Sequence, residues 1–238
     1  MSGVLVGVGV GPGDPELLTL AGLRALREAD AVFVPVGDAG ERGRAEAVVR
    51  AHLGAGRVRR LVFALSGDAA ALERNRRRAA REVAEHLRRG ERCAFATLGD
   101  PNVYSTFTHL ARAVREEVPD VEVRTVPGIT AMQDLASRSG TVLLEGRDRL
   151  ALLPLTAGEE ALGAALGDFE TVVCYKGGGR MAEVLRVAEE AGRLGGAVYG
   201  ARLGVEGEEI LPAREVRGRE APYLSTVIFP RREGEPRG

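Results

Sequence analysis

Short apolar runs alternate with amphipathic stretches through the first half of the chain. Strand-like runs, most of them apolar, cover residues 4–8, 31–36, 58–64, 93–97 and 121–126, and helical patterns begin near Pro15, Arg44, Ala69 and Val103. Strands buried on both faces of a parallel sheet appear as continuous apolar runs, and their alternation with helical patterns is typical of βαβ units. We therefore predict an N-terminal α/β domain with a mostly parallel sheet over residues 1–120.

A second series of apolar runs follows, and it predicts a C-terminal α/β domain over residues 121–238. Its strands are expected at 150–155, 171–175, 197–201 and 223–229, with helices at 159–166 and 180–191. The segment 204–219 is too polar and too rich in glycine for a crossover helix, so we expect a hairpin or loop there and a mixed sheet. A hinge near 119–128 would leave a ligand cleft between the two domains.

The composition is that of an ordinary globular protein, with 45% hydrophobic and 28% charged residues and a formal net charge of −1. This charge gives no overall attraction to nucleic acid or to a membrane. No apolar run approaches the length of a membrane span and no leader segment is evident, which predicts a cytoplasmic protein. Cys93 and Cys174 lie in predicted buried strands and are expected to be core residues.

The predicted helix that starts at Ala69 is rich in arginine, and this pattern allows two interpretations. A basic face could bind RNA. However, Glu82 and Glu85 follow Arg78 and Arg81 at the i,i+4 spacing of ion pairs, and apolar residues form a stripe on the same helix. We favour a solvated helix face.

Two glycine-rich turns, at 7–14 and 98–107, each follow an apolar strand. In the first turn Asp14 is placed to cap a helix that begins at Pro15. A dinucleotide-binding fingerprint needs its third glycine inside the opening helix, which the first turn does not provide. Pro12 also lies where a backbone amide would meet the pyrophosphate, so this fingerprint is excluded. No Gly-Lys-Ser or Gly-Lys-Thr is present, so a P-loop is excluded as well.

These motifs resemble the tetrapyrrole methylase family. The resemblance rests on the opening strand and turn at 6–21, on Gly99-Asp100-Pro101, on the segment 126–130 and on the strand at 171–176. It implies two α/β domains and S-adenosylmethionine as methyl donor. Residues 34–36, 61–63 and 97–107 are most similar to members that methylate precorrin-2 at its C20 meso carbon.

The resemblance also implies the site residues. Asp100 and Tyr104 are the candidate catalytic residues, with a tight turn and helix capping as the alternative roles of that segment. Arginines in a broad trough would bind the substrate carboxylates, and candidates are Arg42, Arg44, Arg138 and Arg147. The expected cofactor contacts are Pro12, Leu98, Gly99, Asp100, Val103, Thr130, Ala131, Tyr175, Lys176 and Leu203.

No metal is required, because the methyl group of a sulfonium is already activated and the enzyme mainly has to position it. His52, His86 and His109 show no ligand spacing, so no metal site is predicted. The expected substrate is precorrin-2 or cobalt-precorrin-2, and the resemblance implies a homodimer. The alternatives are another tetrapyrrole position, ribosomal RNA, a modified protein histidine, or a nonenzymatic module that binds S-adenosylmethionine.

Overall fold

The computed structural model describes residues 3–37, 43–54, 56–63, 69–176 and 178–232, and it divides into two compact units. The first unit is Met1–Thr130 and the second is Ala131–Gly238. We expected the first domain to end at residue 120. It extends further because the strand Glu122–Val126 pairs with the first strand of the chain and so completes the first sheet.

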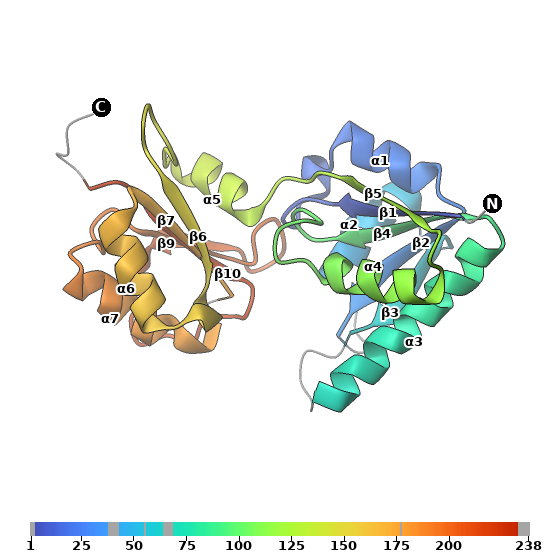
Figure 1. Cartoon of the computed structure of the whole chain (residues 1–238). Coiled ribbons are helices and arrows are strands. Elements are labelled where there is room, and N and C mark those ends of the chain that lie inside the picture. Colours follow the sequence, from blue (N-terminus) through green and yellow to red (C-terminus); the bar gives the residue numbers. More distant parts are fainter. Residues whose placement is uncertain (1–2, 38–42, 55, 64–68, 177, 233–238) are drawn as a thin grey trace. The chain divides into compact units, whose positions relative to one another are not determined.

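The first unit is built on a five-stranded parallel sheet (Figure 1). The strands lie in the order β3-β2-β4-β1-β5. The pairings of β1 with β4 and β5, and of β2 with β3 and β4, are all parallel, as the continuous apolar runs predicted. The strand bounds are β1 Val4–Gly9, β2 Ala31–Val36, β3 Val58–Val62, β4 Arg92–Thr97 and β5 Glu122–Val126.

Helices cover both faces of this sheet. Alternate residues of each strand point to opposite faces, so Val6 and Val8 pack with α1 and α2, whereas Leu5 packs with α3 and α4. The buried stripe predicted for the arginine-rich helix α3 is confirmed, since Val83 and Leu87 are fully buried. The helix bounds are α1 Leu20–Arg27, α2 Arg44–Leu53, α3 Ala69–Arg88 and α4 Thr106–Glu117.

Two helices of the first unit begin later than the sequence pattern suggested. Pro15–Leu17 forms a single 3₁₀ turn, capped by Asp14 as predicted, but Leu18 is extended and Thr19 caps α1 anew through the N–H of Gly22. The helix expected near Val103 begins at Thr106, because Ser105 is its N-cap. Side-chain caps therefore decide where these helices start.

The second unit holds a mixed sheet in the order β6-β7-β10-β8-β9. β6 and β7 are parallel, whereas β10 is antiparallel to both β7 and β8. The segment expected to be a hairpin or loop contains β9, which pairs antiparallel with β8. The strand bounds are β6 Leu150–Pro154, β7 Thr171–Tyr175, β8 Val198–Ala201, β9 Glu209–Pro212 and β10 Ser225–Phe229.

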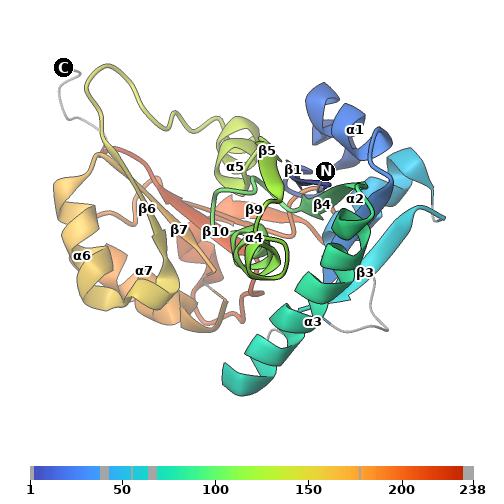
Figure 2. The ribbon, with the colours of Figure 1, turned by 45° about the vertical axis from the view of Figure 1, so that its right-hand side comes forward.

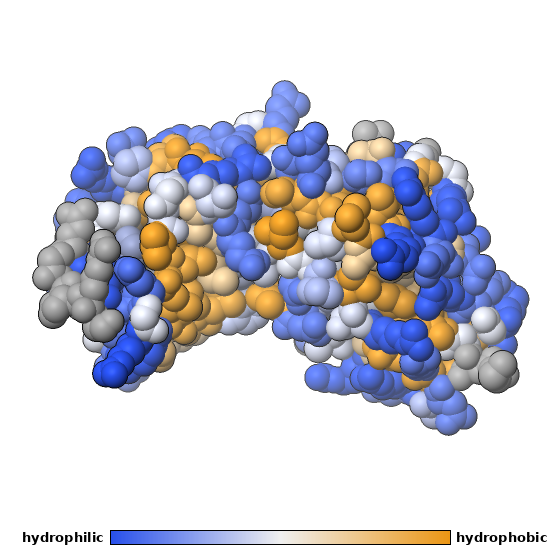
Figure 3. All heavy atoms as spheres, turned by 90° about the horizontal axis from the view of Figure 1, so that it is seen from above, coloured by the Kyte–Doolittle hydropathy of each residue, from blue (hydrophilic) through white to orange (hydrophobic). Residues whose placement is uncertain are grey.

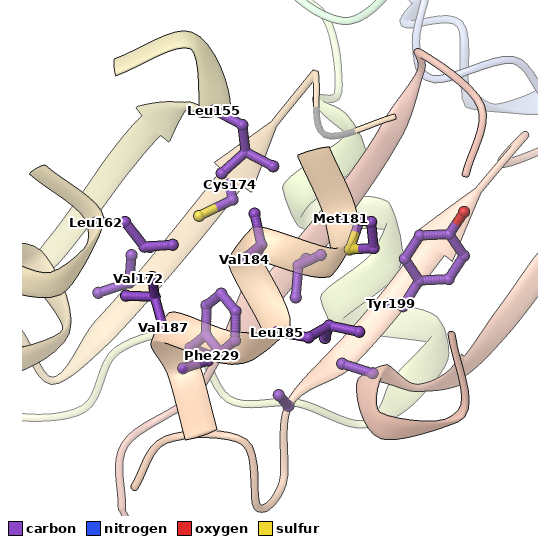
Figure 4. Packing of buried hydrophobic residues seen from close by; sticks show 14 of the residues in the cluster. Leu155, Leu162, Val172, Cys174, Met181, Val184, Leu185, Val187, Tyr199 and Phe229 are labelled. Atoms are coloured by element: carbon purple, nitrogen blue, oxygen red, sulfur yellow. The ribbon is translucent and has the colours of Figure 1, made fainter. Parts of the chain in front are cut away.

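The two faces of this second sheet are covered unequally (Figure 2). Helices α6, Glu159–Asp168, and α7, Met181–Glu190, cover one face, and α5, Ala131–Ser139, covers the other. Figure 4 shows the larger core, in which Val184 and Leu185 of α7 pack near Phe229 of the sheet. The smaller core beneath α5 is centred on Leu135 and Ile228.

Both cysteines are buried core residues, as expected. Burial raises the pKa of Cys93 and of Cys174 to about 12, which keeps both thiols protonated. The face of the molecule in Figure 3 carries hydrophilic side chains with apolar ones between them. Within the described part of the chain, no helix has the length and apolar character needed to cross a bilayer.

Candidate functional site

In the first unit, the loops after β1 and β4 are joined directly by backbone hydrogen bonds. The N–H of Gly99 donates to the carbonyl of Gly11 at 2.8 Å, and the N–H of Val10 donates to the carbonyl of Thr97 at 2.9 Å. The chain leaves β1 toward β2 and leaves β4 toward β5, in opposite directions along the sheet. Such a switch point, at the carboxyl ends of parallel strands, is where open α/β sheets bind ligands.

Three glycines pack backbone against backbone at this edge. A Cβ placed on Gly128 would lie 2.2 Å from the carbonyl oxygen of Gly99, and one placed on Gly9 would lie 2.6 Å from the nitrogen of Gly128. Gly99 itself has a φ of 63°, which favours glycine. Gly9 and Gly128 were not among the predicted site residues, although each ends or follows a strand and so gave a usable signal.

The carboxylate of Asp100 connects two of these loops. One oxygen accepts the N–H of Asn102 at 2.8 Å, and the other accepts the N–H of Gly128 at 3.1 Å. Asp100 therefore fixes its own turn and attaches it to the loop after β5. These bonds give Asp100 a positioning role, beside the catalytic and cofactor roles predicted for it.

The remaining predicted contacts of the first unit lie around this glycine contact. Pro12 is buried directly after the Gly11–Gly99 bridge, and Leu98 packs on the sheet core. Val103 donates its N–H to the carbonyl of Asp100. Thr130 is buried, and its Cα would lie 3.8 Å from a Cβ on Gly99. The fold thus brings these residues, which are distant in sequence, together at the carboxyl ends of the parallel strands.

Tyr104 lies just before α4 in a conformation that is unusual for a tyrosine. Its φ is 47°, and its side chain is 43% exposed. Ser105 accepts the N–H of Phe107 and shares a buried hydrogen bond of 2.9 Å with Thr97, so the helix start is fastened to the end of β4. A left-handed non-glycine residue stores strain, and such residues cluster at functional sites.

The predicted contacts of the second unit also gather, around the N-terminus of α5. Ala131, Tyr175 and Leu203 belong to the apolar cluster between α5 and the sheet. The hydroxyl of Tyr175 accepts the N–H of Met132 at 2.9 Å, which holds the first turn of α5 at the end of β7. Lys176 follows with a φ of 62°, another left-handed side chain at a strand end.

The four candidate substrate arginines have different surroundings. Arg42 falls outside the described residues, Arg44 opens α2, and Arg147 lies in the turn before β6. Arg138 is engaged within its own unit, since it bonds to Asp134 and to both carboxylate oxygens of Glu208. A guanidinium committed to two carboxylates is poorly suited to receive a third, so Arg138 is a weaker candidate than the sequence suggested.

No cluster of three or more His, Cys, Asp or Glu side chains suited to a metal occurs among the residues that the structure describes. His52 bonds to the carbonyl of Pro15, and His86 bonds to Glu91 at 2.5 Å. These are contacts that stabilise the fold.

The family of the chain follows from its sequence. The model of the tetrapyrrole (corrin/porphyrin) methylases matches residues 4–216. The chain belongs to this family. A precorrin-2 C(20)-methyltransferase from Sinorhizobium sp is 36% identical, over 97% of this chain and 98% of that protein. A cobalt-precorrin-2 C(20)-methyltransferase from Salmonella typhimurium is 31% identical, over 96% of each.

Solved structures agree with the fold of this tetrapyrrole methylase. The methyltransferase CobJ superposes with a TM-score of 0.70 at 21% identity and covers 100% of this chain and 98% of its own. The uroporphyrin-III-C-methyltransferase from Thermus thermophilus superposes with a TM-score of 0.64 at 23% identity, covering 97% and 93%. At these identities the likeness establishes the fold alone.

Proposed function

We propose that this protein transfers the methyl group of S-adenosylmethionine to the C20 meso carbon of precorrin-2 or cobalt-precorrin-2. Support comes from the family membership and from near full-length relatives whose names state this reaction. The methylation of another tetrapyrrole position, of RNA or of a protein side chain is less favoured, because these relatives match nearly the whole chain.

The observation that carries the proposal is the contact of Gly9, Gly99 and Gly128 at the carboxyl ends of β1, β4 and β5. Because no side chains stand at this point, backbone N–H and C=O groups of three loops are brought together at the switch point of the sheet. This arrangement suits a compact polar ligand bound through backbone groups. It is consistent with the amino-acid portion and the ribose of S-adenosylmethionine.

S-adenosylmethionine supplies a methyl group that its sulfonium has already activated. The protein's task is then to orient the nucleophile and the methyl group, and an oriented pair about 3–3.5 Å apart accounts for much of the rate. In our proposal Gly99, Asp100 and Thr130 fix the polar end of the donor, while Pro12, Leu98 and Val103 pack on its apolar parts. Tyr104 borders the carbon that accepts the methyl group.

The second unit also holds residues that we propose as contacts of the methyl donor. These are Ala131, Tyr175, Lys176 and Leu203, which lie at the N-terminus of α5 and at the ends of β7 and β8. A homodimer is also proposed from the family resemblance. Light scattering on the purified chain tests it, and a monomer at micromolar concentration would contradict it.

A mass-spectrometric assay tests the reaction. Purified protein is incubated with S-adenosylmethionine and with precorrin-2, either metal-free or loaded with cobalt, and a gain of one methyl group is scored. Asp100→Ala should reduce the gain, whereas Glu116→Gln, an exposed change on α4, should leave it unchanged. If the protein binds S-adenosylmethionine but neither macrocycle gains a methyl group, the proposed C20 methylation is wrong.

A further inference from the structure

We propose that Arg138 is a positioning residue that holds the second-unit contacts of the methyl donor in place. The inference rests on the proposed function, because it concerns the same donor. It gives Arg138 a different role from the binding of substrate carboxylates that its position in the sequence suggested.

A continuous chain of polar contacts runs from α5 to the turn between β8 and β9. Arg138 Nε donates to Asp134 Oδ1 at 2.7 Å, one helical turn earlier in α5. Its Nη1 donates to Glu208 Oε1 at 2.8 Å and Oε2 at 2.9 Å. Glu208 Oε2 in turn accepts the N–H of Gly204 at 2.5 Å. We call these residues, Asp134, Arg138, Glu208 and Gly204, the α5 brace.

The charges make Arg138 the central member of the brace. Asp134 is only 5% exposed, and its second oxygen has no hydrogen-bond partner among the described residues. Arg138 is the cation that offsets this buried carboxylate and that of Glu208. Without Arg138, the buried carboxylate of Asp134 would lose the guanidinium that offsets its charge, and the more exposed carboxylate of Glu208 would lose the partner that ties it to α5.

The brace acts on the elements that carry the predicted donor contacts. Gly204 follows Leu203 directly, so the bond to Glu208 fixes the backbone beside this predicted contact. At the other end, α5 begins with Ala131, and Met132 bonds to Tyr175. Between them, Leu135 lies so close to β8 that a Cβ on Gly200 would be 2.7 Å from its Cδ1. The brace therefore links three of the four second-unit contacts.

Arg138→Met is the first test, because methionine keeps the apolar stem and removes the charge. We expect the KM for S-adenosylmethionine to rise about tenfold, while kcat at saturating donor stays within about twofold. Arg138→Lys keeps the charge but not the two-pronged geometry, so it should recover part of the loss. A merely structural role would lower the melting temperature and leave the KM unchanged, and that result would overturn the proposal.

Arg231→Met is the matched control, since Arg231 also pairs with an aspartate in the same unit, Asp148, whose side chain is 9% exposed. Arg231 follows the central strand β10, and Asp148 precedes β6, which lies at the opposite edge of the sheet from β9, so loss of this pair should reduce stability without changing the KM. If Arg138→Met fails to fold, Glu208→Gln replaces it. That change weakens the bond to Arg138 but retains an acceptor for Gly204, and a smaller rise in KM is expected.

The wild-type protein separates this proposal from the proposed function. If it neither binds S-adenosylmethionine by calorimetry nor methylates a tetrapyrrole, the proposed function fails. If it does both and Arg138→Met has the donor KM of the wild type, only the role of Arg138 fails.

Discussion

The candidate donor contacts of the two units are built in different ways. In the first unit they are made of backbone, with Gly9, Gly99 and Gly128 in direct contact. In the second unit they are held by side chains, namely the bond of Tyr175 to α5 and the α5 brace. The first arrangement requires that Gly9, Gly99 and Gly128 have no side chains, whereas the second requires the polar side-chain atoms that form these bonds.

This difference determines how each part tolerates change. A backbone contact has no flexible end that can move aside, so any added carbon must displace a strand or a loop. A side-chain contact can be weakened by degrees, since a conservative substitution keeps part of the charge or part of the geometry. We therefore expect steep effects in the first unit and graded effects in the second.

Gly128→Ala should have the largest effect. The new Cβ would lie 2.2 Å from the carbonyl oxygen of Gly99 and 2.7 Å from the Cα of Gly9, both of them backbone atoms. Overpacking typically costs about 1–3 kcal/mol, and because backbone atoms cannot move aside we expect a loss of stability of about 3 kcal/mol or more. We also expect donor binding to be lost. Urea unfolding and calorimetry measure the two effects.

Gly167→Ala is the control for this glycine. Gly167 lies in α6, and a Cβ there would meet nothing within 4 Å. Alanine is favoured over glycine in a helix, and Gly167 lies in the last turn of α6, so this change should stabilise by at most about 0.5–1 kcal/mol. If Gly128→Ala and Gly167→Ala changed the free energy of unfolding equally, the special intolerance of the glycine contact to an added Cβ would be contradicted.

Arg193→Met tests the second unit by removing a side chain. Arg193 is buried, and its guanidinium donates to carbonyl oxygens at the end of α6, before β7 and at the end of β10. Leaving buried acceptors unpaired costs about 1–3 kcal/mol each, partly offset by removal of a buried charge, so we expect a loss of about 2–3 kcal/mol. Hydrogen exchange should quicken in α6 and β10. Arg232→Met, at an exposed site nearby, should leave exchange unchanged.

Asp100→Ala should have a smaller effect on stability and a clear effect on donor binding. The change leaves the N–H groups of Asn102 and Gly128 without their acceptor. Water can replace the acceptor at the exposed Asn102, so the cost should arise mainly at the part-buried Gly128 and be about 1 kcal/mol. Asp100→Asn keeps one acceptor oxygen and should lose less. If both variants bind S-adenosylmethionine as the wild type does, Asp100 has no positioning role.

The smallest effects concern pH, and one carboxyl group of each unit, Glu91 and Glu170, serves to test them. The side chains of Arg89 and His86 hold the pKa of Glu91 at about 2, and the side chain of Arg149, followed by its backbone N–H, holds that of Glu170 at about 2. Since both values lie below the ordinary 4.5, the stabilisation is complete above about pH 4.5 and is lost as the pH falls to about 2. Glu91→Gln and Glu170→Gln should each flatten the stability curve in that window.

The sequence was sufficient to predict most strands, because β1, β2, β4, β7 and β10 are largely buried and consist mainly of apolar residues. It located β7 at residues 171–175, as the structure has it. It was less accurate for helix starts, where a single side-chain cap such as Ser105 outweighs the apolar pattern. The polar segment that holds β9 was compatible with a hairpin or a loop, since its pairing with β8 depends on long-range contacts.

The candidate site was predicted less completely than the fold. The turn at Gly99 and Asp100 was evident, but the sequence alone did not indicate that Gly9 and Gly128 meet it, since this contact arises from the strand order. The partners of Arg138 were hidden for a similar reason. Asp134 lies one helical turn away and was within reach of pattern analysis, whereas Glu208 is distant in sequence.

Lys176 is the only lysine in the chain, and it lies at the end of β7 beside a predicted donor contact. An amine-directed reagent therefore has only this side chain to modify, apart from the amino terminus. Slower labelling of Lys176 when a ligand is added would report occupancy in the native enzyme, with no engineered probe. The composition of the chain thus supplies a site-specific reporter of ligand binding.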